Sequence, residues 1–77
     1  MTLGEARAAR LTCLRLALRA ATEAEVWEAR GRHDWAADDR EMARFWRQSA
    51  AQWEIVVQEL LERWELNDIN LKNNLAR

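Results

Sequence analysis

The residue types most able to do chemistry gather near the middle of the chain, where one imidazole and three carboxylates fall within seven residues: His33, Asp34, Asp38 and Asp39. Such groups bind a divalent cation when they converge on one point and an outer shell of hydrogen bonds orients them. The spacing of these four residues indicates neither convergence on one point nor such an outer shell. Carboxylates at the start of a helix, by contrast, cap free N–H groups and offset the helix dipole. We therefore predict a structural role for these residues, with no metal and no other cofactor.

Nucleophilic and acid–base chemistry is equally unsupported. Cys13 and His33 are the only residues of their types and lie in different segments, so no cysteine–histidine pair is indicated. The carboxylates fall on faces that solvent would cover, and no glycine-rich phosphate loop occurs. The sequence predicts that the protein is not an enzyme and that Cys13 is a small buried apolar residue.

Three arginines, Arg40, Arg44 and Arg47, would lie along one side of a helix. A row of guanidinium groups is either a solvated face or a surface that recognises phosphate or an acidic partner. The net charge of −1 disfavours a non-specific nucleic-acid binder, which is ordinarily basic. Binding of nucleic acid through these arginines, doubled in a dimer, stays an alternative to binding of a protein.

Four of the five tryptophans recur at helical spacing. Trp35, Trp46, Trp53 and Trp64 are separated by 11, 7 and 11 residues, and these steps return to nearly the same face of a helix. Because each indole buries on the order of 200 Å² when it packs, such a face requires a neighbour. Either the stripe is the core of a helical bundle, or its two ends contact a different protein. The predicted partner-binding residues are accordingly Trp35, Arg40, Arg44, Arg47 and Trp64.

These side chains must be positioned by helices, because the chain has no proline, only two glycines and much alanine, leucine, glutamate and arginine. Thr2 and Glu5 form a capping box that begins a helix of residues 3–30, and Gly31 fits the left-handed position that ends it. Asp34 is the predicted N-cap of a second helix of residues 35–66. So short a connection joins the two helices as an antiparallel hairpin.

Charge favours the same pairing, because a hairpin brings the start of the chain beside the end of the second helix. Arginines dominate the first of these segments and glutamates the second, at Arg7, Arg10, Arg15 and Arg19 and at Glu54, Glu59, Glu62 and Glu65. Exposed ion pairs contribute only about 0–1 kcal/mol each, so the pattern selects the orientation more than it stabilises the fold.

The first helix carries alanines between two ridges of larger apolar residues, an arrangement that suits a helix with two close neighbours. The hairpin supplies one neighbour. A second chain supplies the other, since a chain of 77 residues with a single cysteine builds only a marginal core alone. We therefore predict an all-α fold that dimerises into a four-helix bundle. The residues predicted to form its core and dimer interface are Leu11, Leu14, Leu18, Trp27, Met42, Trp46, Trp53, Val56 and Leu60.

The composition changes after residue 66, because all the asparagines and the single lysine follow it. We expect a hairpin domain of residues 1–66 and a polar tail or short helical arm of residues 67–77. No apolar run approaches the ~18 residues that span a bilayer, and no signal peptide is indicated. With its single cysteine, the chain is expected to be cytoplasmic and to bind no membrane.

The sequence thus favours a protein that acts by binding another molecule over an enzyme. We expect a small cytoplasmic regulator of the inhibitor, anti-activator or adaptor type, such as phages and mobile elements encode, that acts by occupying the surface of a partner protein. Its partners would be a second copy of itself and one heterologous protein. The alternatives are a dimeric nucleic-acid-binding regulator that uses Arg40, Arg44 and Arg47, and a structural subunit of a larger assembly.

Overall fold

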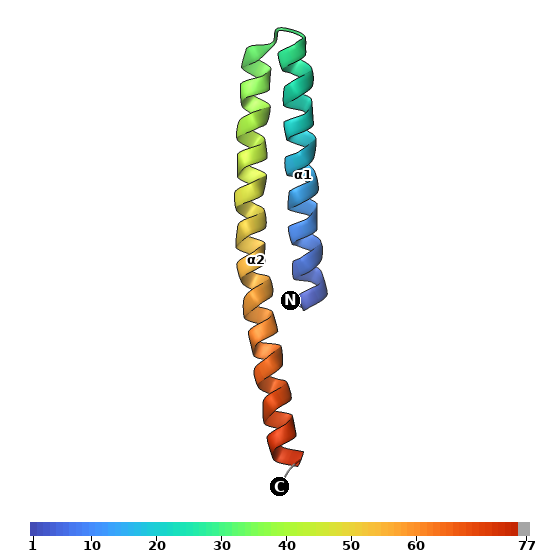
Figure 1. Cartoon of the computed structure of the whole chain (residues 1–77), viewed down its shortest axis with the longest axis vertical. Helices are drawn as coiled ribbons and strands as arrows, with labels where there is room; N and C mark the ends of the chain where they lie inside the picture. Colours follow the sequence, from blue (N-terminus) through green and yellow to red (C-terminus); the bar gives the residue numbers. More distant parts are fainter. Residues whose placement is uncertain (76–77) are drawn as a thin grey trace.

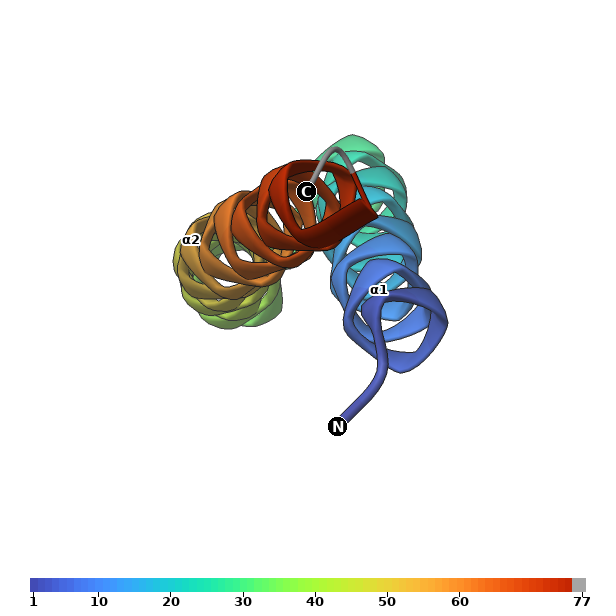
Figure 2. The same ribbon diagram turned by 90° about the horizontal axis from the view of Figure 1, so that it is seen from below.

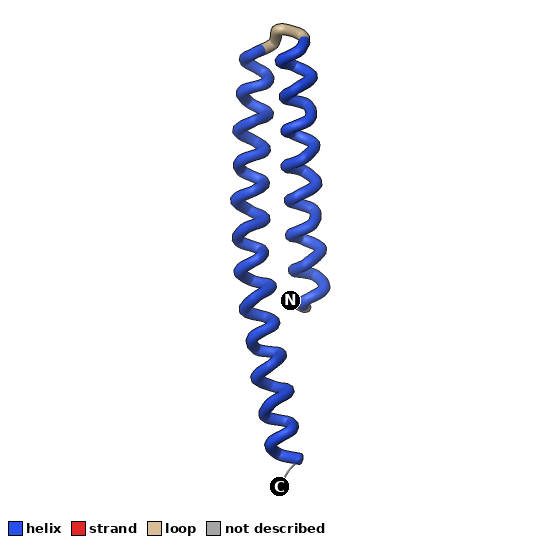
Figure 3. The backbone as a smooth tube through the Cα atoms, in the orientation of Figure 1, coloured by secondary structure: helices blue, strands red, loops and turns tan. Residues whose placement is uncertain are grey.

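The protein is a single helical hairpin (Figure 1). The computed structural model describes the backbone of residues 1–75 and the side chains of residues 1–64. Helix α1 spans Leu3–Ala29 and helix α2 spans His33–Leu75. The two helices lie side by side and antiparallel, joined by a short turn (Figure 3). The predicted all-α antiparallel hairpin is confirmed.

The molecule is a rod. Its Cα trace measures 70 × 15 × 13 Å, and its radius of gyration is 19.3 Å. A compact domain of this length would have a radius of gyration of about 11–12 Å. The helix axes are inclined to each other, as the view along the rod shows (Figure 2). All tertiary packing within the described residues therefore lies along one helix–helix interface.

Local signals in the sequence define both ends of α1. The Thr2 side chain accepts a hydrogen bond from the Glu5 backbone N–H at 3.1 Å, and the Glu5 carboxylate accepts one from the Thr2 backbone N–H at 3.2 Å. At the other end Gly31 has φ +76°. Its N–H donates to the Glu28 carbonyl at 3.0 Å, and the Arg32 N–H donates to the Trp27 carbonyl at 2.9 Å. Both the capping box and the left-handed glycine after the end of the helix are confirmed.

Helix α2 begins earlier than the sequence suggested. Its first residue is His33, and the Ala36 N–H already donates to the Arg32 carbonyl at 3.0 Å. Asp34 therefore lies in the first turn instead of at the N-cap, where it was predicted. Its charge still offsets the helix dipole, because the first turn is where a carboxylate has that effect.

Helix α2 also continues past residue 66, where it was expected to end, and ends at Leu75. No residue there requires a left-handed backbone, and asparagine without such a requirement is only a weak helix breaker. The end of α2 extends beyond the start of α1 (Figure 1). The predicted polar tail is thus helical in its backbone as far as residue 75, and its side chains lie outside the described residues.

Small side chains form the contact between the helices. They recur at heptad spacing, which keeps one face of each helix toward the other, and each is at most 9% exposed. Because alanine projects only a methyl group, the backbones approach closely along this line. We call it the small-residue seam; it consists of Ala6, Cys13, Ala17, Ala20 and Ala24 on α1 and Ala36, Ala43, Ala50 and Val57 on α2.

Larger apolar residues flank the seam instead of filling it. Among the residues predicted for the core, Trp27, Trp46, Trp53, Val56 and Leu60 are half-buried, whereas Leu11, Leu14, Leu18 and Met42 are exposed. The physical reason is the close approach of the two backbones, which leaves room at the contact line only for side chains no larger than valine. The four exposed residues are not part of the core of the hairpin, and their place in a dimer stays a prediction.

One ion pair ties the two segments whose charges favoured an antiparallel arrangement. The Arg10 guanidinium lies 2.7 Å from the Glu54 carboxylate, with both side chains about half exposed. Arg10 stands in the row of seam residues, between Ala6 and Cys13, and extends its charged end out to solvent. The predicted pairing of these segments is confirmed. Neither helix contains, among the described residues, a stretch that is long and apolar enough to cross a bilayer.

Candidate binding surfaces

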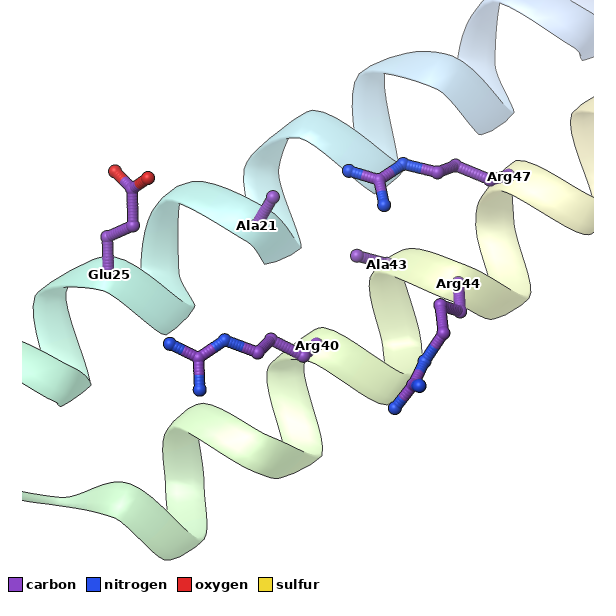
Figure 4. Close-up of a pocket in the computed structure, with 6 residues that line it drawn as sticks. All are labelled: Ala21, Glu25, Arg40, Ala43, Arg44 and Arg47. Atoms are coloured by element: carbon purple, nitrogen blue, oxygen red, sulfur yellow. The ribbon is translucent and has the colours of Figure 1, made fainter.

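An arginine-lined groove runs between the two helices on one side of the seam. Its lining consists of Ala21, Glu25, Arg40, Ala43, Arg44 and Arg47. Ala21 of α1 and Ala43 of α2 form the floor, and the Ala43 side chain is directed toward α1 (Figure 4). Arg40 and Arg47 extend from α2 toward α1, and Arg44 points away from it (Figure 4). The structure thus brings together the three arginines that the sequence singled out. We call this surface the arginine groove.

Glu28 contacts Arg40 at the end of the arginine groove that lies nearest the turn. Its carboxylate is 3.2 Å from the Arg40 guanidinium and 2.6 Å from His33 Nδ1. The hydrogen bond from His33, followed by that from Arg40, keeps the pKa of Glu28 below its usual value. Sequence reasoning missed this residue, because Glu28 and Arg40 are twelve positions apart and become neighbours only when the turn reverses the chain.

Replacing Glu28 with glutamine is expected to make the stability of the hairpin less dependent on pH. Because the pKa of Glu28 is lowered on folding, its contacts stabilise the protein above the usual glutamate pKa and are lost as the pH falls through the folded-state value. The wild-type melting temperature should therefore drop more on acidification than that of Glu28→Gln. Thermal melts followed by circular dichroism, near neutral pH and well below the usual glutamate pKa, measure the difference. Equal drops would show that these contacts do not stabilise the fold.

A row of exposed leucines on α1 leads into the arginine groove. Leu11, Leu14 and Leu18 are 45%, 38% and 68% exposed. They continue at helical spacing into Ala21 and Glu25, which line the groove, so the row and the groove share one side of the hairpin. We call Leu11, Leu14 and Leu18 the leucine row. These residues were predicted to lie in a core, and only the position of α2 shows that they adjoin the arginines.

The other side of the hairpin carries the tryptophan stripe of α2. A second groove on that side is lined by Leu16 and Ala20 of α1 and by Met42 and Trp46 of α2, among others. Phe45 packs edge to face on Trp46, with ring centroids 5.1 Å apart, and is 53% exposed. We call this surface the aromatic face; it consists of Trp35, Met42, Phe45, Trp46, Trp53, Val56, Leu60 and Trp64.

The two terminal tryptophans of the stripe are in different surroundings. Trp35 is 43% exposed, but its ring lies edge-on against Trp27 with centroids 4.6 Å apart, and the Arg32 guanidinium stacks 3.5 Å from its centroid. Trp35 therefore also holds the turn together. Trp64 is 68% exposed. Of the predicted partner-binding residues, Trp64 and the three arginines are the more accessible.

The remaining candidate residues serve the fold. Cys13 is 5% exposed within the seam, as predicted for a small buried residue. Among the described residues, no three histidine, cysteine or acidic side chains come close enough together to hold a metal ion. His33 contacts Glu28, and Asp34 contacts Arg32 at 3.5 Å. One Asp39 oxygen is buried beside the seam and has no hydrogen-bond partner within the described hairpin.

Comparisons with protein-family models, with curated proteins and with solved structures found no match to this chain.

Proposed function

We propose that the protein is a small protein-binding regulator that acts by covering an acidic and apolar surface of a partner protein. One observation carries the proposal: the leucine row and the arginine groove form a continuous surface across both helices. Leucines that are 38–68% exposed beside three guanidinium groups contribute little to the stability of the hairpin itself, so their arrangement fits a contact surface.

The side chains of the arginine groove and the leucine row indicate what kind of partner would bind there. Guanidinium groups bind carboxylates in bidentate geometry, and the alanine floor of Ala21 and Ala43 lets a partner chain approach the arginines closely. The leucine row adds apolar area next to those charges. A helix with acidic residues on one edge and apolar residues on the other would satisfy both halves of the surface.

Binding is a better proposal than catalysis because of the shape of the groove. It is an open surface between two helices, and water would reach any reacting group within it. Catalysis usually requires a site that excludes water and fixes reacting atoms in place. We extend the proposal to a homodimer, in which the exposed apolar residues of α2 form a four-helix bundle with those of a second copy.

The test compares capture of partners by the wild-type chain and by two triple variants. One variant carries Arg40→Gln, Arg44→Gln and Arg47→Gln. The control carries three glutamines at arginines of α1 outside the groove, Arg7→Gln, Arg15→Gln and Arg19→Gln. Each tagged protein is incubated with a lysate of the source cells, with and without nuclease, and bound proteins are quantified by mass spectrometry. Circular dichroism confirms that all three proteins are helical.

We expect one stoichiometric protein that survives nuclease, is retained by the control and is reduced at least tenfold with the groove variant. Equal retention by the groove variant would contradict the assignment of the surface. Release of all bound material by nuclease would favour the nucleic-acid alternative, since phosphate would then be the ligand of the arginines.

A further inference from the structure

The tryptophans of the aromatic face are arranged as a palindrome. Trp46 and Trp53 are centred on the peptide bond between Ser49 and Ala50, and Trp35 and Trp64 are centred on the same bond. Measured along the helix axis from that bond, the indoles therefore lie at equal distances in the two directions. A surface of this kind is complementary to itself when a twofold axis crosses the helix at its centre, which is the geometry of an isologous dimer.

We infer that the aromatic face is covered by α2 of a second copy, running antiparallel, with the twofold axis at Ser49–Ala50. This inference rests on the proposed dimer and specifies its register. Trp46 of one copy then lies level with Trp53 of the other, and Trp35 lies level with Trp64. The residue beside the axis on this face is small: Ser49 is half-buried, so both helices can approach there, while Ala50 faces α1 in the seam.

The position of the axis fits the length of the hairpin. The segment of α2 that pairs with α1 runs from the turn to the neighbourhood of Leu60 and Trp64, which share a surface groove with Leu3 and Gly4 at the start of α1. Ser49 lies near the middle of that segment. Two hairpins related by this axis therefore overlap along their whole paired length, and neither leaves part of its aromatic face uncovered.

The exposed aromatic rings supply part of the area that a dimer buries. Trp35, Phe45 and Trp64 are 43%, 53% and 68% exposed. Since each aromatic side chain offers roughly 200 Å², these three alone leave about 330 Å² of apolar surface. A standard interface buries about 800 Å² on each partner. The half-buried residues of the aromatic face and the polar rim would supply the remainder.

The charged residues at the edge of the proposed dimer interface agree with this antiparallel register. The twofold axis is perpendicular to the two α2 helices, which run in opposite directions. It therefore brings one edge of α2 next to the same edge of α2 in the second copy. Arg63 of one copy then lies level with residue 36 of the other, midway between Asp34 and Asp38 on that edge. Each end of the interface thus places one arginine between two carboxylates. Phe45, on the same edge, lies level with residue 54 of the second copy, between Gln52 and Val56.

The arrangement leaves the arginine groove free. That groove and the leucine row lie on the side of the seam opposite the aromatic face. A dimer formed through the aromatic face would present two copies of the partner-binding surface, one on each hairpin, pointing away from each other.

The test is site-directed cross-linking in a background where Cys13 is replaced by alanine, the residue type that already forms most of the seam. Single cysteines are placed at Ser49, Met42 and Val56, and a control cysteine is placed at Ala51, which is exposed on another face of α2. Each variant is treated with a short bismaleimide, and Met42→Cys and Val56→Cys are also mixed before treatment. Light scattering gives the mass of each sample.

We expect a dimer mass, efficient cross-linking of Ser49→Cys, and cross-linking of the Met42→Cys and Val56→Cys mixture at least tenfold above either variant alone. In this register Met42 lies within one residue of the height of Val56 in the second copy, and about 22 Å along the axis from the second Met42. Cross-linking of Met42→Cys with itself, or of Ala51→Cys, would overturn the register while the dimer stands. A monomer mass would overturn the dimer as well, and neither result affects capture of a partner through the arginine groove.

Discussion

Replacing Ala43 with leucine is expected to lower the free energy of unfolding by about 1–3 kcal/mol. Ala43 is 2% exposed, and its side chain points toward α1 (Figure 4). Three added carbon atoms cannot fit where two backbones approach this closely, so the helices must separate or the side chain must adopt a strained rotamer. Each kcal/mol lowers the melting temperature of a domain of this size by roughly 4–8 °C.

Ala51→Leu is the matched control for this substitution. Ala51 lies on the same helix but is exposed, and alanine and leucine have similar helix propensities. Thermal and urea denaturation followed by circular dichroism compare the two variants with the wild type at one protein concentration. A melting temperature of Ala43→Leu equal to that of Ala51→Leu would mean that the helices are not in close contact at this position.

Replacing Gly31 with valine is expected to lower the free energy of unfolding by about 2 kcal/mol. Gly31 has φ +76°, a conformation that a β-branched residue adopts only with strain of order 1–3 kcal/mol. A Cβ atom at this position would meet nothing within 4 Å, so the cost comes from the backbone conformation and not from a collision. The valine would also disturb the two hydrogen bonds that close the end of α1.

Two further variants distinguish the effect of the left-handed backbone at Gly31 from a general sensitivity of the protein to glycine replacement. Gly31→Asn should cost much less, because asparagine tolerates the left-handed conformation. Gly4→Ala should increase stability by up to about 1 kcal/mol, because Gly4 lies inside α1 without a positive φ and an added Cβ would meet Thr2 Oγ1 at an ordinary contact distance of 3.9 Å. Urea denaturation measures all three. Equal stability of the valine and asparagine variants would contradict the role of the backbone conformation.

The ends of α1 were predictable because local chemistry determines them. The Thr2 and Glu5 pair satisfies N–H groups within one turn, and Gly31 is one of only two residues without a Cβ. The ends of α2 were predicted less well. Asp34 has the side chain of an N-cap and Asn67 that of a C-cap, yet the helix includes both. Capping preferences are worth only about 1 kcal/mol, so they do not by themselves determine where a helix begins or ends.

The sequence by itself determined that the chain forms two helices, that they run antiparallel, and that a tryptophan stripe and three arginines lie on α2. These follow from periodicity, from a short turn and from complementary charge along the chain. Only the tertiary structure decided which part of each apolar arc meets the other helix. A helical pattern specifies a wide face, whereas close approach of two backbones selects the narrow line of small side chains within it. That selection exposed Leu11, Leu14 and Leu18, and reversal of the chain at Gly31 placed Glu28 beside Arg40.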